Sequence, residues 1–201
     1  MFEKLTRGTA YPLLRHLTSP VVAITTTAGG RPNGMIANSA QRGSLVPSVP
    51  RLLIYISKTN YSHDMVMESG LFGVHLLRND QWDLIWQLGL QSAADVPDKL
   101  EGLELRTGET GCPLLVDCMA AFECRVINAM DGGAATFFLG DIVQDYRGKE
   151  GDVMTSGYFR QNMSLERKQV YESKLAAAMG YLEPMARTID TSGWKGPRGQ
   201  K

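Results

Sequence analysis

The stretch PVVAITTTAGGRPNGMIANSAQRGSL, residues 20–45, decides the fold class. Its first part, 20–27, begins with a proline and is rich in β-branched residues, which favours a strand. Glycine, proline and asparagine crowd residues 29–34, which is typical of a turn. We therefore expect residues 35–45 to pair back as the second arm of a β-hairpin.

Strand patterns continue along the chain. The apolar residues of 51–57 (RLLIYIS) occupy both parities, which predicts a strand buried on both faces, and 71–77 (LFGVHLL) is similar. Apolar and charged residues alternate in 118–127. A bend is expected at Gly140 in the next strand, 136–146, which a turn at residues 131–133 would join to its predecessor as a hairpin.

Helical periodicity is found in residues 60–69, 80–90 and 164–182. In the last segment Tyr171, Leu175, Ala178, Met179 and Leu182 share one side. The strands do not alternate regularly with helices, and neither GxGxxG nor GxxxxGK[ST] is present, which disfavours a doubly wound parallel sheet. The pattern predicts a mainly β protein with flanking helices, built as a closed or nearly closed antiparallel barrel.

Composition excludes several classes of protein. The 201 residues carry 21 Lys and Arg against 21 Asp and Glu, so no basic surface for nucleic acid is expected. No apolar run approaches the roughly 18 residues of a membrane-spanning helix, so no membrane partner is expected either. We predict one domain over residues 1–190, ending in a helix, and a flexible or partner-docked tail over 191–201.

Cysteines and histidines give no sign of a metal site. The three cysteines are an odd number without CxxC pairing, which favours reduced thiols in a cytoplasmic protein over disulfides or zinc. Cys118 and Cys124 fall at buried strand positions. The three histidines, His16, His63 and His75, occur without HExxH or a nucleophile elbow, so structural roles are predicted for them.

Small polar residues interrupt the second arm of the hairpin. Ala37, Asn38 and Ser39 have short side chains, so a flat ligand could approach the backbone closely. Asn38 offers both a donor and an acceptor, and Ser39 offers a hydroxyl. The alternative is a bulged strand whose polar side faces water.

A second candidate segment, residues 57–64, lies between a predicted strand and a predicted helix. Free N–H groups at the start of the helix would point towards an anion there. Lys58 would supply a charge to a phosphate monoester, and Ser57 and Ser62 would supply hydroxyls. The alternative is an ordinary helix cap made by Ser62 or Asn60.

Taken together, these segments resemble the flavin reductase-like family of FMN-binding split-barrel proteins. The resemblance rests on GMIANSAQRGSLVPSVPRLLIYISKTNYSHDMVMESGLFGVHLL (34–77), on SPVVAITTTAGGRPN before it (19–33) and on FFLGDIV (137–143). It covers roughly residues 10–160. It implies an antiparallel Greek-key split β-barrel and a homodimer with FMN near the dimer interface.

The resemblance also implies which residues contact the cofactor. These residues are Ala37, Asn38, Ser39, Gln41, Ser57, Lys58, Tyr61 and Ser62. The first three match the strand that meets the isoalloxazine ring, and Gln41 matches a position that is often Thr or Ser. Ser57, Lys58 and Ser62 match the phosphate-side segment, and Tyr61 falls beside the flavin.

Three departures from the family pattern concern the side that would meet the reductant. Residues 132–136 (GGAAT) lack a histidine that many reductases carry there. His75 stands where an asparagine is common, and an arginine-containing region is matched only loosely by residues 155–160. These departures weaken the case for nicotinamide-dependent activity more than the case for FMN binding.

The resemblance implies an NAD(P)H-dependent flavin reductase that transfers hydride to flavin. FMN is the expected cofactor, with FAD as the other candidate, and a flavin-dependent monooxygenase is the expected partner. No metal is expected, and no catalytic residue is assigned, because hydride transfer needs no protein acid or base. The alternatives are a flavoredoxin-like electron carrier or flavin-delivery protein without its own nicotinamide site, and a barrel that holds another ligand or none.

Overall fold

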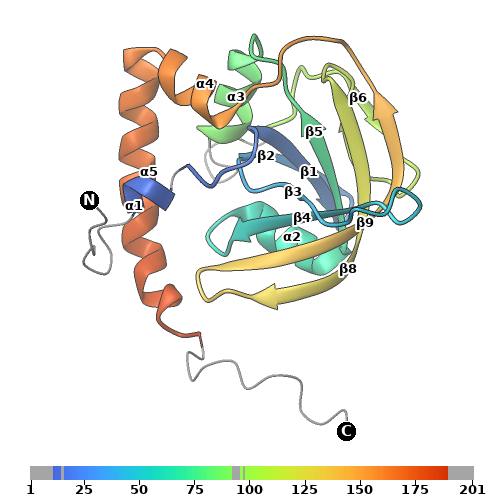
Figure 1. Ribbon diagram of the computed structural model, residues 1–201, viewed down its shortest axis with the longest axis horizontal. Helices are drawn as coiled ribbons and strands as arrows, with labels where there is room; N and C mark the ends of the chain where they lie inside the picture. The colour runs from blue at the N-terminus through green and yellow to red at the C-terminus, as the bar shows by residue number, and fades with distance from the viewer. Residues whose placement is uncertain (1–10, 15, 92–95, 97, 190–201) are drawn as a thin grey trace, which may run out of the picture.

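The computed structural model describes residues 11–14, 16–91, 96 and 98–189 (Figure 1). The predicted tail, 191–201, lies outside the described residues, as does the beginning of the predicted domain. Within the described residues, no helix combines the length and the apolar character needed to cross a membrane.

The described residues form one antiparallel sheet with the strand order β2-β1-β5-β8-β9-β4-β3. Its strands are β1 (Val22–Ala28), β2 (Arg31–Ala37), β3 (Gln41–Arg42), β4 (Arg51–Ser57), β5 (Leu71–Leu76), β8 (Ala120–Asp131) and β9 (Ala135–Arg147). A separate two-stranded sheet pairs β6 (Leu105–Thr107) with β7 (Pro113–Leu115). The predicted mainly β, antiparallel architecture is confirmed.

The first hairpin is confirmed, with a tighter turn than predicted. Gly29 and Gly30 have φ angles of 56° and 74°, and Ala28 pairs with Arg31 across the turn. Two residues with positive φ match the right-handed twist of the paired strands. The predicted turn over 29–34 was therefore wrong in its extent, because β2 begins directly after the two glycines. The predicted second arm, 35–45, was also wrong in its extent, because pairing with β1 ends at Ala37 and residues 41–42 pair with β4 instead.

The prediction that β4 is buried on both faces was wrong. Ile54 and Ile56 are fully buried, whereas Tyr55 between them is 46% exposed. One edge of β4 pairs with the long strand β9 and the other only with the two residues of β3. β5 conforms to the prediction, because its four central residues are all buried.

Two large apolar clusters and a small one, Leu114 with Cys118 and Ala121, fill the interior. The larger lies among the strands and includes Ile24, Ile54, Phe72 and Phe138. Gly140 lets the ring of Phe72 approach β9, because a Cβ at this position would collide with it. The strand β8 has a register irregularity between Val126 and Asn128, opposite Gly140 and Leu139 of β9, whereas the bend predicted at Gly140 itself stays a prediction.

The second cluster joins the sheet to the helices. It includes Val21, Leu77, Ile85, Leu88 and Met154. The helices are α1 (Tyr11–Leu14), α2 (Tyr61–Ser69), α3 (Trp82–Gly89), α4 (Ser156–Asn162) and α5 (Leu165–Ala186). The three predicted helices are confirmed as α2, α3 and α5, with ends shifted by a few residues, whereas α1 and α4 were not predicted.

Helix α5 runs along one side of the molecule, with α3 and α4 beside one end (Figure 1). At that end Arg167 forms an ion pair with Asp83 at 2.6 Å, and its guanidinium lies 5.4 Å from the Trp86 ring centroid. At the other end Gly133, in the β8–β9 turn, approaches the backbone of Met185 and Ala186. The helix thus connects two distant parts of the barrel.

The predicted inner side of α5 is largely confirmed. Tyr171, Leu175, Ala178 and Leu182 are half-buried. Met179, which the periodicity placed on the same side, is 46% exposed. No residue of α5 whose side chain is described is fully buried, so the helix rests on the barrel without entering the core.

All three cysteines are free and buried, as predicted for Cys118 and Cys124. Burial raises the pKa of the Cys112 thiol to about 12 and that of Cys118 to about 11. It also raises the pKa of Cys124. Because the thiolate is the reactive form, these cysteines behave as small apolar residues.

His75 is a fully buried structural residue. Its Nδ1 lies 3.3 Å from the Ala23 carbonyl oxygen, and its Nε2 accepts a hydrogen bond from the Leu115 backbone N–H at 3.1 Å. Nδ1 must therefore carry the proton of a neutral ring. The predicted structural role is confirmed: the ring ties β7 to the strands β1 and β5.

Acid should destabilise the protein through His75. Burial lowers its pKa from 6.5 to about 4 in the folded chain. The unfolded chain therefore binds more protons between these values, and about 3 kcal/mol of stability, present above about pH 6.5, is lost as the pH falls towards 4. Urea unfolding at about pH 7 and about pH 4.5 measures this loss, and His75→Asn should flatten the dependence. An equally steep dependence in the variant would contradict the assignment.

Candidate functional site

A cavity of about 320 Å³ lies between β2, the start of α2, the end of α3 and α5. Residues 59–62 line it, as do Met35 and Ile36 of β2. Two lysines, Lys99 and Lys174, line the cavity, and none of the described residues around it is Asp or Glu. The cavity is therefore suited to a negatively charged group.

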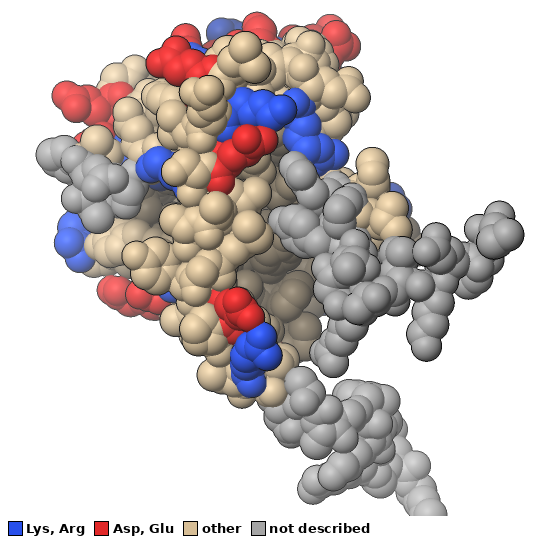
Figure 2. Space-filling view, turned by 90° about the vertical axis from the view of Figure 1, so that its left-hand side faces the viewer, with Lys and Arg blue, Asp and Glu red and all other residues tan. Residues whose placement is uncertain are grey.

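A second cavity of about 120 Å³ adjoins the first. Both are lined by Ile36, Gly89, Leu90 and Tyr171, so they form one groove beneath α5. The smaller cavity has a mainly apolar lining, which includes Val21, Ala37, Asn38, Ile85 and Phe159. Figure 2 looks onto this side of the molecule, and uncharged residues dominate the middle of the face.

The predicted ring-binding segment divides between the groove and the interior. Ala37 and Asn38 line the smaller cavity. Ser39 is buried, and its hydroxyl donates a hydrogen bond to the Tyr55 carbonyl oxygen at 2.8 Å. Gln41 is exposed on β3 and is not part of the lining of either cavity. The groove therefore brings together Ala37 and Asn38 but leaves out Gln41.

Tyr61 and Ser62 from the predicted phosphate segment line the larger cavity. Ser62 is buried, and its Oγ accepts a hydrogen bond from Asn33 Nδ2 at 2.9 Å. Asn60 is the N-cap residue of α2, but its side chain makes no capping hydrogen bond. The interpretation of this segment as an ordinary side-chain cap is therefore wrong. The His63 N–H donates to the Asn60 carbonyl oxygen at 2.8 Å, so among the described residues at the start of α2 the N–H groups of Tyr61 and Ser62 are left for another acceptor.

Ser57 and Lys58 are engaged outside the cavity lining. The hydroxyls of Ser57 and Thr59 lie 2.9 Å apart. Lys58 Nζ forms an ion pair with Asp131 at 2.8 Å, and this contact lowers the pKa of that carboxyl. The β8–β9 turn, which carries Asp131, thus holds the lysine that the sequence pattern assigned to a phosphate.

The lysine that faces the cavity from the core is Lys99, which sequence reasoning missed. It is 8% exposed, and its Nζ donates a hydrogen bond to the Leu88 carbonyl oxygen at 2.5 Å, at the end of α3. Burial lowers its pKa to about 8, and the charge of Lys174 adds to this effect. Lys99 follows no strand or cap motif, so the sequence offered no signal for it.

His63 holds α2 against the start of β9. Its Nε2 lies 2.8 Å from Thr136 Oγ1, and its Nδ1 lies 2.7 Å from Asp64 Oδ1. Both ring nitrogens are thus engaged within the protein. This arrangement confirms the structural role predicted for His63, beside the turn in which the family histidine is missing.

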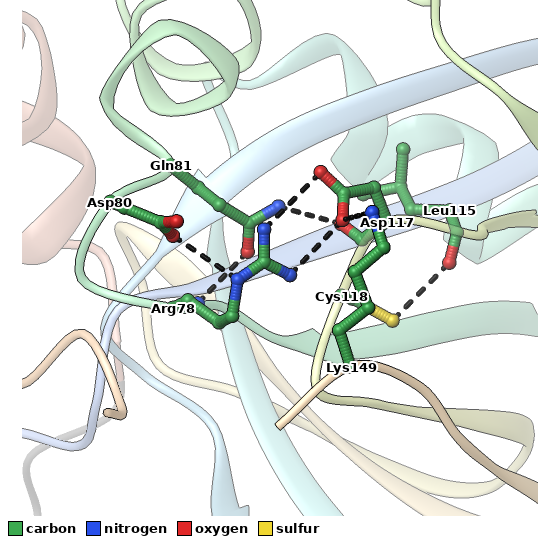
Figure 3. Close-up of polar contacts among 7 residues, drawn as sticks. All are labelled: Arg78, Asp80, Gln81, Leu115, Asp117, Cys118 and Lys149. Carbon is green, nitrogen blue, oxygen red and sulfur yellow. Dashed lines mark hydrogen bonds and ion pairs between the residues drawn. The ribbon is translucent and has the colours of Figure 1, made fainter. Parts of the chain in front are cut away.

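Another polar cluster surrounds Arg78, just after β5 (Figure 3). Arg78 makes two hydrogen bonds to Asp117, at 3.1 and 3.3 Å, and a third to Asp80. Lys149 also pairs with Asp117, and the Gln81 amide donates to the Asp117 carbonyl oxygen at 2.6 Å. The charges are mutually satisfied, so this cluster fastens loops together and is not a candidate for ligand binding.

Comparison with known proteins agrees with this geometry. The protein-family model for the flavin reductase like domain matches residues 14–164 of the sequence. A ferric-chelate reductase (NAD(P)H) of Archaeoglobus fulgidus is 31% identical over 134 residues, which are 66% of this chain and 78% of the relative. The reductase subunit HsaB of a flavin-dependent monooxygenase from Mycobacterium tuberculosis is 30% identical over 121 residues, 60% of this chain and 62% of the relative.

Among solved structures, the NADH:FAD oxidoreductase SgcE6 of Streptomyces globisporus superposes with a TM-score of 0.66 at 26% identity. The superposition covers 78% of this chain and 95% of the other. The chain therefore belongs to the flavin reductase-like domain family and is a flavin reductase-like oxidoreductase.

Proposed function

We propose that this protein is an NAD(P)H-dependent flavin reductase that binds FMN, or FAD in its place, in the groove beneath α5. The observation that carries the proposal is the pairing of two unlike cavities. The smaller one is mainly apolar and is lined by Ala37 and Asn38, whereas the larger one contains Lys99 and Lys174 without a carboxylate among the described lining residues. A flavin mononucleotide has the same two parts, a flat ring and an anionic phosphate.

The residues present fit such a ligand. Ala37 has a short side chain, and Asn38 can both donate and accept a hydrogen bond at a ring edge. Apolar side chains such as Ile85 and Phe159 would exclude water from the ring. At the other end, residues 59–62 line the larger cavity, and the N–H groups of Tyr61 and Ser62 at the start of α2 would donate to a phosphate placed there.

The chemistry of the reaction belongs to the cofactor, since a bound flavin accepts a hydride from a nicotinamide and passes its electrons on. The protein positions the ring and keeps water away from it. Among the described residues that line the smaller cavity, no acidic and basic side chains form a pair beside Ala37 or Asn38. Hydride transfer requires no such pair.

We also propose that the reduced flavin serves a partner oxygenase. Support comes from the relative in Mycobacterium tuberculosis, which is a reductase subunit of a flavin-dependent monooxygenase.

Exposed apolar side chains on and near the β3–β4 loop, such as Leu45 at 81% and Val46 at 53%, favour a homodimer that covers them. Light scattering at micromolar concentration measures the oligomeric state, and a monomer would contradict the homodimer.

Anaerobic spectroscopy tests the proposed function. Purified protein mixed with FMN should shift the flavin absorbance bands, and NADH or NADPH should then bleach them faster than in free FMN. Binding without bleaching by either donor would favour the electron carrier instead. That alternative draws on residues 132–136, where the family histidine is missing and Gly133 packs against α5. Absence of any flavin binding would contradict both hypotheses.

A further inference from the structure

One wall of the larger cavity lies outside the family domain. The family match ends at residue 164, and α5 begins at Leu165. Nevertheless, Tyr171, Lys174, Leu175 and Ala178 of α5 all line the cavity. The groove of this protein is therefore completed by a helix that the family domain does not supply.

The two cavity lysines come from different segments of the chain and line the same space. Lys99 comes from the segment that follows α3, and Lys174 comes from α5. They are close enough for the charge of one to affect the titration of the other. Two cations with no carboxylate among the described lining residues repel each other, and a bound anion would relieve this repulsion.

The described residues use only part of the hydrogen-bonding capacity of Lys99. An ammonium group has three N–H donors, and within the described residues one of them is engaged, by the Leu88 carbonyl oxygen. The side chain is nevertheless 8% exposed. A cation that is buried this deeply at a cavity wall gains most from a charged acceptor in that cavity.

We propose that Lys99 and Lys174 together bind a phosphate group of the cofactor, with α5 as the part of the site that is particular to this protein. This inference rests on the proposed function and deepens it. The phosphate belongs either to the flavin or to the nicotinamide dinucleotide, and the two sources share the same recognition chemistry. Lys58, which is paired with Asp131, is not needed for this contact.

Flavin titration tests the proposal directly. Lys99→Met removes the charge but keeps the length of the buried side chain, and Lys174→Gln removes the charge from an exposed helix position. If the phosphate is that of the flavin, Lys99→Met should weaken FMN binding roughly 10-fold or more, and Lys174→Gln should weaken it several-fold. Riboflavin, which has no phosphate, should lose less than about threefold. Quenching of flavin fluorescence measures both affinities.

The matched control is Lys168→Gln on the same helix. Lys168 faces Glu172 at 3.9 Å and does not line the cavity. This variant should bind FMN and riboflavin like the unmodified protein. A loss of FMN affinity in the control equal to that in Lys174→Gln would indicate a general charge effect and would overturn the proposal.

A second arm identifies the source of the phosphate. With riboflavin as the acceptor, the KM for NADH should stay unchanged in both variants if the lysines bind the flavin phosphate. A KM raised about 10-fold with unchanged FMN affinity would support the proposal with the nicotinamide dinucleotide as the ligand.

Several results would overturn the proposal. Unchanged FMN affinity together with an unchanged KM in both variants would do so. Equal losses for FMN and riboflavin would show that Lys99 only supports the end of α3. If Lys99→Met fails to fold, the exposed Lys174 decides the question alone. Failure of the unmodified protein to bind any flavin would instead contradict the proposed function, so the two failures are distinguishable.

Discussion

Replacing Glu123 by leucine is expected to lower the free energy of unfolding by about 3–5 kcal/mol. Glu123 lies on β8 and is fully buried. Its carboxylate accepts hydrogen bonds from the backbone N–H groups of Glu109 and Thr110, at 2.9 and 2.6 Å, and from the Thr110 hydroxyl. Leucine fills the space but leaves these donors without an acceptor. Urea unfolding, extrapolated to zero denaturant, measures the loss.

Glu123→Gln is the matched variant, because it keeps the shape and one acceptor oxygen. It should lose roughly half as much stability as the leucine variant, since its amide NH₂ then faces a backbone N–H. Gly108 agrees with this account, because a Cβ there would collide with the Glu123 carboxylate. If leucine were tolerated with a loss below about 1 kcal/mol, the loop between β6 and β7 would not depend on this carboxylate.

Much of the fold follows from local sequence patterns. The glycine pair after β1 and the alternation in β8 predict the two hairpins, because turn conformation and side-chain direction are local properties. The double burial predicted for β4 failed at Tyr55, since the burial of a strand depends on which elements cover its faces. Burial on each face is set by the whole sheet, and a seven-residue pattern does not contain that information.

The candidate site was predictable where it lies on regular elements. Ala37 and Asn38 at the end of β2, and Tyr61 and Ser62 at the start of α2, were all found in the sequence and all line the groove. The sequence pattern predicted Lys58 as the lysine that binds the phosphate. The residues around Lys58 in the sequence do not show that the distant β8–β9 turn brings Asp131 to it.

Lys99 was missed for the opposite reason. It lies in an irregular segment, and its position in the cavity depends on how that segment packs against the end of α3. Lys174 had a weak signal, since it lies on the predicted helix next to Leu175 of the inner side. Charge placement at this site is therefore a tertiary property, whereas the apolar half of the groove is encoded locally.

Leu90→Trp is expected to weaken FMN binding at least about 100-fold, or about 2.8 kcal/mol, in a protein that still folds. Leu90 directly follows α3, is half-buried and lines both cavities, so its side chain lies where they adjoin. A bound flavin would extend across both cavities, with its ring in one and its phosphate in the other. An indole at this position would occupy the space between them. Fluorescence titration measures the affinity, and thermal unfolding verifies the fold.

Leu90→Met provides the control, because it conserves volume and apolar character, and it should bind FMN within about threefold of the unmodified protein. Riboflavin separates this prediction from that for the lysines. Blocking the groove at Leu90 removes space for the ring system, so riboflavin and FMN should lose affinity together, whereas loss of Lys99 or Lys174 should spare riboflavin if the bound phosphate is that of the flavin. A folded Leu90→Trp protein that binds FMN normally would place the flavin outside the groove beneath α5 and would contradict the proposed function.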